Sequence, residues 1–405
     1  MIIDSIKELE EWFSKNGLKG WDPYDIKDSK IYLNIGKIEI KLIKRILLKI
    51  INISVDIFPN ISRKILCIEP LENAKGIGLV LSSYCNLYKK TNDNIYLEKA
   101  LFYANWLLNN KSKGYHGYSW GYPFDWKSNI FIPKNTPSSV VSYVVGNSFF
   151  SLYKVTKDIK YLEICKEICV FFTKSLNVTY LKDDCLCYSY TPLDDFQVHN
   201  ANLFVGEFLS RIGKEINNQD WVKNGLKCAN FAVLEQQKDG YLPYWALSQT
   251  KNYSDGKIKF DHYHSGFEIR MLYNIWKNTN SLHIKNAWIK YFTFYNKYLF
   301  NKEHIPKLTV KKFYPVNIHA IAESILCLNQ VNQYYENKYD FKIKLIYEWL
   351  EKNMKFDKGE YCYKIIKLPI IGEYKVKIAM YRWGQAWIFY ALTEYYCNKE
   401  EYNEK

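Results

Sequence analysis

Apolar residues recur along most of the chain at the spacing of amphipathic helices. In the segment 100–107, apolar side chains stand at positions 100, 103, 104 and 107, and the segment 165–172 repeats this spacing. Residues three and four positions apart share one face of a helix, so each segment presents one apolar face. The pattern predicts an all-α protein whose helices pack through such faces.

One sequence motif occurs twice and indicates a repeated helical hairpin. Residues 87–98 and 152–163 share the pattern Leu-Tyr-Lys-x-Thr-x-Asp-x-x-Tyr-Leu-Glu, and weaker echoes begin at Asn218 and Asn278. The pattern predicts the end of one helix, a tight turn, and a new helix with the Asp at its N-cap. Each repeat is about 55 to 65 residues long, which suits two helices and a loop. A further hairpin is expected around 339–352.

Five or six such hairpins can close into a double ring, a toroid of the (α/α)6 type. Closure removes the exposed ends of an open α-solenoid, which is the structural alternative. The loops between hairpins, such as 117–126 and 239–245, are rich in Gly, Pro and aromatic residues, and short β-hairpins are expected in these rim loops. Because no Gly/Ser-rich or Pro-rich linker interrupts the chain, we interpret 1–405 as a single toroid domain. Within it, 1–75 is expected to be an N-terminal helical extension that packs on the ring.

Composition and charge narrow the expected partners. The chain has 36 Tyr and 12 Trp, whose flat apolar faces and polar tips suit stacking on sugar rings. The net charge of +14 would suit nucleic acid, anionic lipid or acidic glycan. The basic residues are scattered, however, and no nucleic-acid-binding motif is found. A glycan or sugar is therefore the expected partner and nucleic acid is not, while nothing indicates an oligomeric state.

The sequence also predicts where the protein works. Ten Cys without a Cys-x-x-Cys pair fit reduced core thiols rather than a disulfide scaffold. The N-terminus lacks the features of a signal peptide, and no uncharged run approaches the length of a membrane span, so a cytoplasmic location is expected. The segment 37–58 combines Ile and Leu with Lys and Arg. Such a basic amphipathic helix either packs on its own domain or makes peripheral contact with the inner face of the membrane.

The first candidate for chemistry is an acid surrounded by aromatic side chains. Asp125 lies in the segment 120–126, together with Trp120 and Tyr122. Apolar surroundings raise the pKa of a carboxyl group and can make it a general acid, while the aromatic rings could stack on a sugar. The alternative is that Asp125 caps a turn.

Polar residues at one expected helix start form a second group. Tyr190 precedes the segment 198–202, which contains His199, Asn200 and Asn202. His199 could transfer a proton near neutral pH, and the two Asn side chains could bind hydroxyls or a carboxylate. His199 and Asn202 are three positions apart and share a face. The alternative for His199 is a core residue on an apolar face.

A third group occupies the segment 261–268. Asp261 is the expected N-cap of a helix that begins with His262 and His264, and Glu268 shares a face with His264. We interpret Asp261, His264 and Glu268 as candidates for acid–base catalysis and His262 as a substrate contact. The His-x-His pair also suggests a metal, but the ligand spacing of a catalytic zinc site, such as His-Glu-x-x-His, is absent. No metal is expected.

Arg382 is the candidate for binding an acidic group. Its planar guanidinium suits bidentate capture of a carboxylate, and the alternative is a salt bridge that closes the last hairpin. The other candidate substrate contacts are Tyr244, His319, Tyr381, Trp383 and Gln385.

Several common cofactor sites are not indicated. The chain has no Gly-rich dinucleotide fingerprint, no phosphate-binding P-loop and no Gly-x-Ser-x-Gly elbow. No cofactor is therefore expected, and nicotinamide chemistry, nucleotide hydrolysis and a Ser triad are disfavoured. The Asp-rich diphosphate motif of terpenoid cyclases, which also use helical toroids, is absent as well.

These motifs resemble a family of α/α-toroid proteins encoded with surface-polysaccharide biosynthesis genes. The resemblance spans 20–25, the Asp125 and His199 motifs, 261–268, His319 and 381–387, and is nearly full length. Where similar chains have Asp-x-Phe-His-Thr-Gly, this chain has Asp-His-Tyr-His-Ser-Gly at 261–266. The resemblance implies the fold and a glycan context but no particular reaction. More distantly, the architecture is similar to that of glycoside hydrolases, polysaccharide lyases, uronyl C5-epimerases and sugar 2-epimerases.

Three hypotheses about function follow. The first is an enzyme that acts on an oligo- or polysaccharide, one that could contain uronic acid, by epimerase- or lyase-type proton abstraction. In it His199, His264 or a Tyr is the base, and Arg382 and Asn200 neutralise the acid. The second is a glycoside hydrolase with a carboxylate pair, Asp125 with Asp261 or Glu268. The third is a non-catalytic glycan-binding or assembly-scaffold protein.

Overall fold

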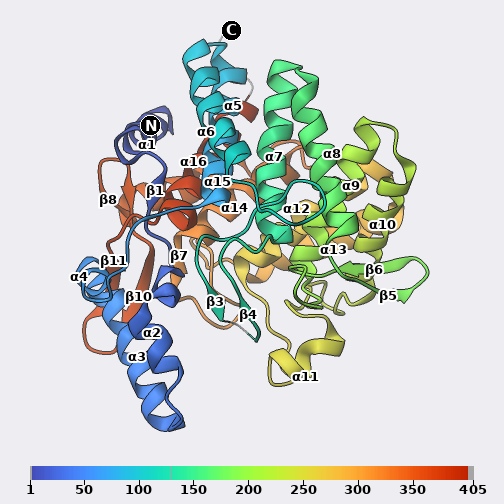
Figure 1. Cartoon of the computed structure of the whole chain (residues 1–405). Coiled ribbons are helices and arrows are strands. Elements are labelled where there is room, and N and C mark those ends of the chain that lie inside the picture. The colour runs from blue at the N-terminus through green and yellow to red at the C-terminus, as the bar shows by residue number, and fades with distance from the viewer. Residues whose placement is uncertain (1, 128, 400–405) are drawn as a thin grey trace.

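A closed double ring of helices forms the body of the protein, as the sequence predicts. The computed structural model describes residues 2–127 and 129–399. Within these residues the inner ring consists of α5 (Ala74–Thr91), α7 (Ser139–Thr156), α9 (His199–Glu215), α12 (His262–Thr279), α14 (Ile318–Asn332) and α16 (Ala386–Asn398), the last of which continues the turn η3 (Tyr381–Gln385). Consecutive inner helices pack against each other, and α16 packs against α5, which closes the ring (Figure 1).

The outer helices alternate with the inner ones along the chain. They are α6 (Asn94–Asn109), α8 (Ile159–Lys174), α10 (Gln219–Leu234), α13 (Leu282–Tyr298) and α15 (Asp340–Asn353). The outer partner of α16 comes from the start of the chain, because α1 (Ile2–Asn16) packs against it. Burial distinguishes the two layers: 14 of the 17 residues of α9 are buried, but only five of the 16 residues of its outer partner α10. A helix buried on nearly all sides belongs to the centre of a fold.

The repeated motif makes the turn that its sequence predicts. Asn92 and Lys157 adopt the left-handed backbone conformation at the ends of α5 and α7. Asp93 and Asp158 then cap the next helix, each accepting a hydrogen bond from the backbone N–H two residues later. The cap satisfies one of the backbone donors that a helix start leaves unpaired.

Short antiparallel strand pairs occupy the loops at the rim. They are β1 (Lys19–Gly20) with β2 (Leu71–Glu72), β3 (Trp126–Lys127) with β4 (Phe131–Ile132), β5 (Val178–Lys182) with β6 (Cys185–Tyr188), β8 (Lys355–Asp357) with β9 (Glu360–Tyr361), and β7 (Val316–Asn317) with β10 (Lys364–Leu368), which also pairs with β11 (Gly372–Val376). A short helical segment follows α10, formed by η2 (Leu247–Gln249) and α11 (Thr250–Tyr253).

A helical arm projects from the ring near the N-terminus. It consists of η1 (Asp25–Asp28), α2 (Lys30–Gly36), α3 (Lys41–Ile57) and α4 (Pro59–Ile65), and Figure 1 shows α2 and α3 extending away from the body. A buried ion pair joins the first and last helices of the arm, in which Nε of Arg63 lies 3.0 Å from Oδ2 of Asp25. None of the described helices is both long enough and apolar enough to cross a membrane.

Close contact between α9 and α10 provides a test of the packing. A Cβ atom added at Gly225 would lie 2.7 Å from Cβ of Ser210 and would also meet the backbone carbonyl of Gly206. Because such overpacking forces the helices apart, Gly225→Ala is expected to lower the free energy of unfolding by about 1–3 kcal/mol. Urea denaturation measures the change.

Gly36→Ala is the matched control for this substitution. Gly36 has open space around its added Cβ atom, so the change is expected to stay within about 1 kcal/mol and to favour the folded state. Equal effects of the two substitutions would contradict the packing described here.

Candidate functional site

The starts of the inner helices surround one cavity of about 100 Å³. In each hairpin the chain follows an inner helix in one direction and returns along an outer helix. The inner helices are therefore parallel, and their N-termini meet at one mouth of the ring. The second residue of each of the first five inner helices lines this cavity, and so does the second residue of η3, which leads into α16. These residues are Lys75, Val140, Asn200, Tyr263, His319 and Arg382. Helix N-termini carry partial positive charge and favour anions.

Aromatic side chains form the wall of the cavity. The rim loops contribute Tyr24, Tyr122, Trp126, Tyr190 and Tyr244, and the helix starts contribute Tyr263, Phe267 and Trp383. The ring of Trp126 stacks on Tyr24 at 6.1 Å between centroids and meets Tyr190 edge-on at 5.9 Å. Flat aromatic surfaces of this kind, with polar groups between them, suit a sugar ring.

His264 is held in place by the acid that caps its helix. Its Nδ1 lies 2.7 Å from Oδ2 of Asp261, and its backbone N–H donates to Oδ1 of the same side chain. A carboxylate bonded to one ring nitrogen fixes the orientation of an imidazole and leaves the other nitrogen for a ligand. His264 retains 18% exposure of its side chain and lines the cavity, so its ring can meet a substrate.

His319 is buried against the aromatic wall without a hydrogen bond. Its ring lies 4.5 Å from Trp383 and 4.7 Å from Trp387, and neither ring nitrogen meets hydrogen-bonding geometry with any described residue. Burial, with the nearby cations Lys75 and Arg382, lowers its pKa well below the usual value. An unpaired buried polar group is costly, so a histidine of this kind in the lining of a cavity points to a ligand that pairs with it.

Arg382 already holds a carboxylate of the protein. Its Nε and Nη2 lie 2.6 and 2.7 Å from the two oxygens of Asp22, and both side chains are buried. Asn73 donates a further hydrogen bond to Asp22. The bidentate capture expected of a substrate carboxylate is thus occupied by Asp22, and only Nη1 of Arg382 lacks a partner within the described structure.

Eight of the candidate residues line the cavity, although they come from segments far apart in the chain. They are Tyr122, Tyr190, Asn200, Tyr244, His264, His319, Arg382 and Trp383. Asp261 joins them through its bond to His264. Asn200 is buried, and its Oδ1 is unpaired among the residues described, which leaves it available to a ligand.

Candidates at the first residue of an inner helix face the outer layer instead. Nε2 of His199 lies 2.8 Å from Oε2 of Glu235 at the end of α10, and the side chain of His199 is fully buried. His262 contacts Tyr295 of α13 and Ser324 of α14. One helical position turns a side chain by about 100°, which separates these residues from their cavity-lining neighbours. His199 and His262 therefore lie outside the cavity.

Tyr381 is the first residue of η3, and its side chain packs in the core. Its ring lies 5.2 Å from Phe13 of α1, which is part of the contact between the first helix of the chain and the last hairpin. Gln385 ties the turn η3 to the rim strands, because its Oε1 accepts a hydrogen bond from the backbone N–H of Tyr361 and its Nε2 donates to the carbonyl of Gly359. Both side chains have structural partners rather than a place in the cavity.

The carboxylates expected for hydrolysis lie outside the cavity. Asp125 accepts a hydrogen bond from the backbone N–H of Lys134, which is the turn-capping role. Glu268 points to the outer layer, where Tyr291 donates to it at 2.5 Å, and burial raises its pKa. Neither contributes to the lining of the cavity.

Two further candidates hold loops against the ring. The indole N–H of Trp120 donates to the carbonyl of Leu107 at 2.8 Å. Asn202 accepts from the backbone N–H of Tyr188 and donates to the carbonyls of Leu186 and Cys228. Within the described residues, no group of three or more His, Cys, Asp or Glu side chains could hold a metal ion.

Lys75 is the charged residue of the cavity that the sequence patterns did not identify. It lies at the second position of α5 beside the cap Asn73, and it is 4% exposed. Lysine usually extends into solvent, so its type gives no signal; its position relative to the helix start does. Tyr24 and Trp126 also line the cavity. They lie in the motifs 20–25 and 120–126, but the sequence does not single them out as substrate contacts.

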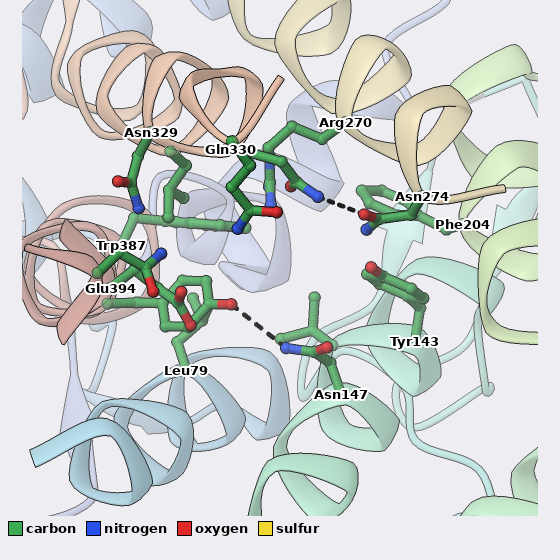
Figure 2. Close-up of a pocket in the computed structure, with 15 residues that line it drawn as sticks. Leu79, Tyr143, Asn147, Phe204, Arg270, Asn274, Asn329, Gln330, Trp387 and Glu394 are labelled. Carbon is green, nitrogen blue, oxygen red and sulfur yellow. Dashed lines mark hydrogen bonds between the residues drawn. The ribbon is translucent and has the colours of Figure 1, made fainter. Parts of the chain in front are cut away.

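A second chamber lies at the other end of the ring (Figure 2). Figure 2 shows Gln330 bonded to Asn274. The amide of Asn147 donates to the hydroxyl of Tyr390 at 3.4 Å, so several amides of this chamber bond to other lining residues. Arg270 in its wall pairs with Glu323 at 2.6 Å. The indole of Trp387 lines this chamber and also contacts His319, which lines the first cavity. The cavity at the N-termini of the inner helices, called the N-terminal cavity from here on, contains the ring nitrogens of His319, unpaired within the described structure, and is the candidate functional site.

Solved structures with the same fold include sugar epimerases and glycoside hydrolases, although their sequences differ widely from this one. A cellobiose 2-epimerase from Bacillus thermoamylovorans aligns with a TM-score of 0.62 at 11% identity, over 80% of this chain and 87% of the epimerase. A GH76 α-mannanase from Bacteroides thetaiotaomicron aligns with a TM-score of 0.58 at 10% identity, over 80% and 86%. An unsaturated glucuronyl hydrolase specific for heparin aligns with a TM-score of 0.56 at 12% identity, over 81% and 87%.

No protein-family profile and no curated protein sequence matches the chain. At these identities the structural likeness establishes the α/α-toroid fold and leaves the reaction to be argued from the site.

The buried, neutral His319 predicts how stability depends on pH. Its folded pKa lies below the unfolded value of about 6.5, so below that pH the unfolded chain binds a proton that the folded protein excludes. Stability therefore falls with decreasing pH, by up to about 1.4 kcal/mol per pH unit from this group. In His319→Gln the slope between pH 7 and pH 5, measured by urea denaturation, is expected to be shallower.

His283→Gln is the control, because His283 is exposed on α13 and should leave the slope unchanged. A His319→Gln variant with the wild-type slope would contradict a neutral, buried His319.

Proposed function

We propose that the protein is an enzyme that acts on a carbohydrate by moving a proton at carbon, as an epimerase or lyase does. In this proposal the N-terminal cavity binds one sugar unit, free or at the end of a glycan of surface-polysaccharide synthesis. The fold of known sugar epimerases supports this assignment, and so does the resemblance of the sequence motifs to surface-polysaccharide proteins. The functional argument itself rests on the residues of the cavity.

The proposed reaction rests on the set of chemical groups that line the cavity. Two histidines and two cationic side chains are present, but among the described lining residues there is no Asp or Glu. A glycoside hydrolase of the usual kind needs two carboxyl groups flanking the bond that breaks. Abstraction of a proton beside a carbonyl or carboxyl group instead needs a base and positive charge near the developing oxyanion. The lining matches the second requirement.

The two histidines divide the proton transfers between them. His319, which burial keeps neutral, accepts the proton from the substrate carbon. His264, oriented by Asp261, donates a proton to that carbon on its other face. The amide of Asn200 binds the oxygen that becomes negative in between, and the nearby positive charge of Arg382 stabilises it. Exchange of protons with solvent then returns both histidines to their starting states, so hydrogen from water ends in the product.

The test is hydrogen exchange at carbon in heavy water. Cellobiose, D-mannose and D-glucuronate are incubated with the protein in ²H₂O, and deuterium in recovered sugars is followed by NMR. Deuterium at a former C–H position is expected with at least one sugar. His264→Gln and His319→Gln are each expected to slow exchange by about 10²–10⁴-fold, the usual effect of losing an acid–base group. His283→Gln is the control and should retain the rate.

Two other outcomes would identify the alternatives. New reducing ends without deuterium at carbon would mean hydrolysis. Saturable sugar binding that survives both substitutions, with no turnover, would mean a binding protein. Either result would overturn the proposed reaction.

A second part of the proposal concerns the arm, which we propose lies on an anionic membrane surface. Leu42, Ile46 and Ile50 form an exposed apolar stripe along α3, with between 49% and 67% of each residue accessible. Lys41, Arg45 and Lys49 form an exposed basic stripe directly beside it. Because residues four apart align on a helix, acyl chains and acidic headgroups can meet the two stripes together.

Vesicle sedimentation tests this docking. The protein is expected to sediment with phosphatidylglycerol-containing vesicles more than with pure phosphatidylcholine vesicles. The double substitution Ile46→Asp with Ile50→Asp is expected to weaken binding by at least about tenfold, because two buried Ile side chains contribute about 1.5–3 kcal/mol each. Leu282→Asp, an equally exposed position on α13, is the control. Equal sedimentation of the double variant and the wild type would contradict membrane docking.

A further inference from the structure

Lys75 is a buried lysine whose nearest acids, Asp22 and Glu323, act on it without forming an ion pair. The side chain lies in the cavity and is almost fully buried, and its ammonium has no ion pair or hydrogen bond within the described structure. The nearest recorded contacts are the rings of Trp387 at 5.6 Å and Phe267 at 6.0 Å. A buried ammonium without a partner is costly, and the positive end of a helix adds to that cost. An anion bound in the cavity would supply the missing partner of the Lys75 ammonium.

The neighbouring acids are already engaged. Asp22 gives both oxygens to Arg382, and Glu323 of α14 gives both oxygens to Arg270 of α12. The other groups that act on Lys75 are cationic or neutral. Arg382 belongs to a turn that packs directly on α5, because a Cβ atom added at Gly76 would lie 3.2 Å from Cα of Arg382. His264 and His319 complete the titratable lining.

A second buried lysine shows what a paired one looks like. Lys342 of α15 is 7% exposed, yet its ammonium donates to Oδ1 of Asn296 at 2.7 Å and lies over the ring of Phe300. Burial lowers the pKa of both lysines to about 7. The two differ in that Lys75 opens into the cavity and lacks the polar partner that Lys342 has.

We propose that Lys75 and the free Nη1 of Arg382 bind a negatively charged group of the substrate, a carboxylate or a phosphate, so that the substrate class is an anionic sugar. This inference rests on the proposed function only in placing a sugar in the same cavity. The converging helix N-termini favour the same charge, and the absence of carboxylates among the described lining residues removes repulsion against it. The aromatic wall remains for the neutral parts of the sugar.

The experiment is calorimetric titration with charged and uncharged sugars. D-Glucuronate and D-glucose 6-phosphate are compared with D-glucose on the full-length protein. At least one anionic sugar is expected to bind about tenfold or more tightly than D-glucose, and which one does so distinguishes carboxylate from phosphate. At pH 8 unliganded Lys75 is mostly neutral, so anion binding should take up close to one proton, measured from buffers with different ionisation enthalpies.

The variants assign the effect to Lys75. Lys75→Met is expected to lose both the preference for the anionic sugar and the proton uptake. Lys75→Arg should retain the preference without proton uptake, because arginine stays charged. Lys342→Met is the matched control and should behave as the wild type, and circular dichroism establishes that each variant is folded.

The inference is overturned if D-glucose binds as tightly as both anionic sugars, or if folded Lys75→Met binds them with unchanged affinity. Neither result affects deuterium incorporation at carbon. A failure of this inference is therefore distinguishable from a failure of the proposed reaction.

Discussion

Closure of the ring is the constraint on which the site depends. A chain of hairpins can close only if its inner helices run in the same direction, and their N-termini then meet at one mouth. The last inner helix, α16, follows the last complete hairpin and takes its outer partner from the beginning of the chain. Phe13 of α1 lies 5.4 Å from Phe389 of α16, so residues from both ends of the sequence pack in this contact. Asp22 and Tyr24 reach the cavity from the same N-terminal segment.

Converging helix starts make the mouth electropositive, and the side chains there reflect it. Asp22 pairs with Arg382, but Nη1 of Arg382 and the ring nitrogens of His319 have no hydrogen-bond partner among the described residues, and Lys75 lines the same cavity. A folded protein rarely leaves buried polar groups unpaired unless a ligand or water completes them. Four buried atoms that are unpaired within the described structure, from Asn200, His319 and Arg382, belong to the lining of this one cavity, and departures from local rules are expected at a functional site.

Much of the fold could be predicted from the sequence because its signals are local. The duplicated motif contains its own turn and N-cap, so each hairpin can be recognised within a dozen residues. The site was predicted in part, since polar residues at helix starts are conspicuous. Which of them face the centre depends on a single helical step, and this is why Asn200 lines the cavity whereas His199 pairs with Glu235.

Other features of the site depend on contacts that no local pattern contains. Arg382 and Asp22 are 360 positions apart, so the salt bridge could be named as an alternative but its partner could not. Lys75 has the residue type of a solvated surface, and only the closed ring buries it. Asp125 illustrates the opposite case, because a conspicuous acid among aromatic residues proved to cap a turn.

The most direct test of the account is NMR of the histidine side chains. The protein is labelled with ¹⁵N at histidine, and imidazole resonances are followed while a sugar that undergoes exchange is added. The account predicts that the resonances of His264 and His319 shift with ligand, whereas those of His199 and His262 stay in place. Shifts confined to His199 and His262, or saturable binding that leaves all four unchanged, would contradict the central claim that ligands bind where the inner helices begin.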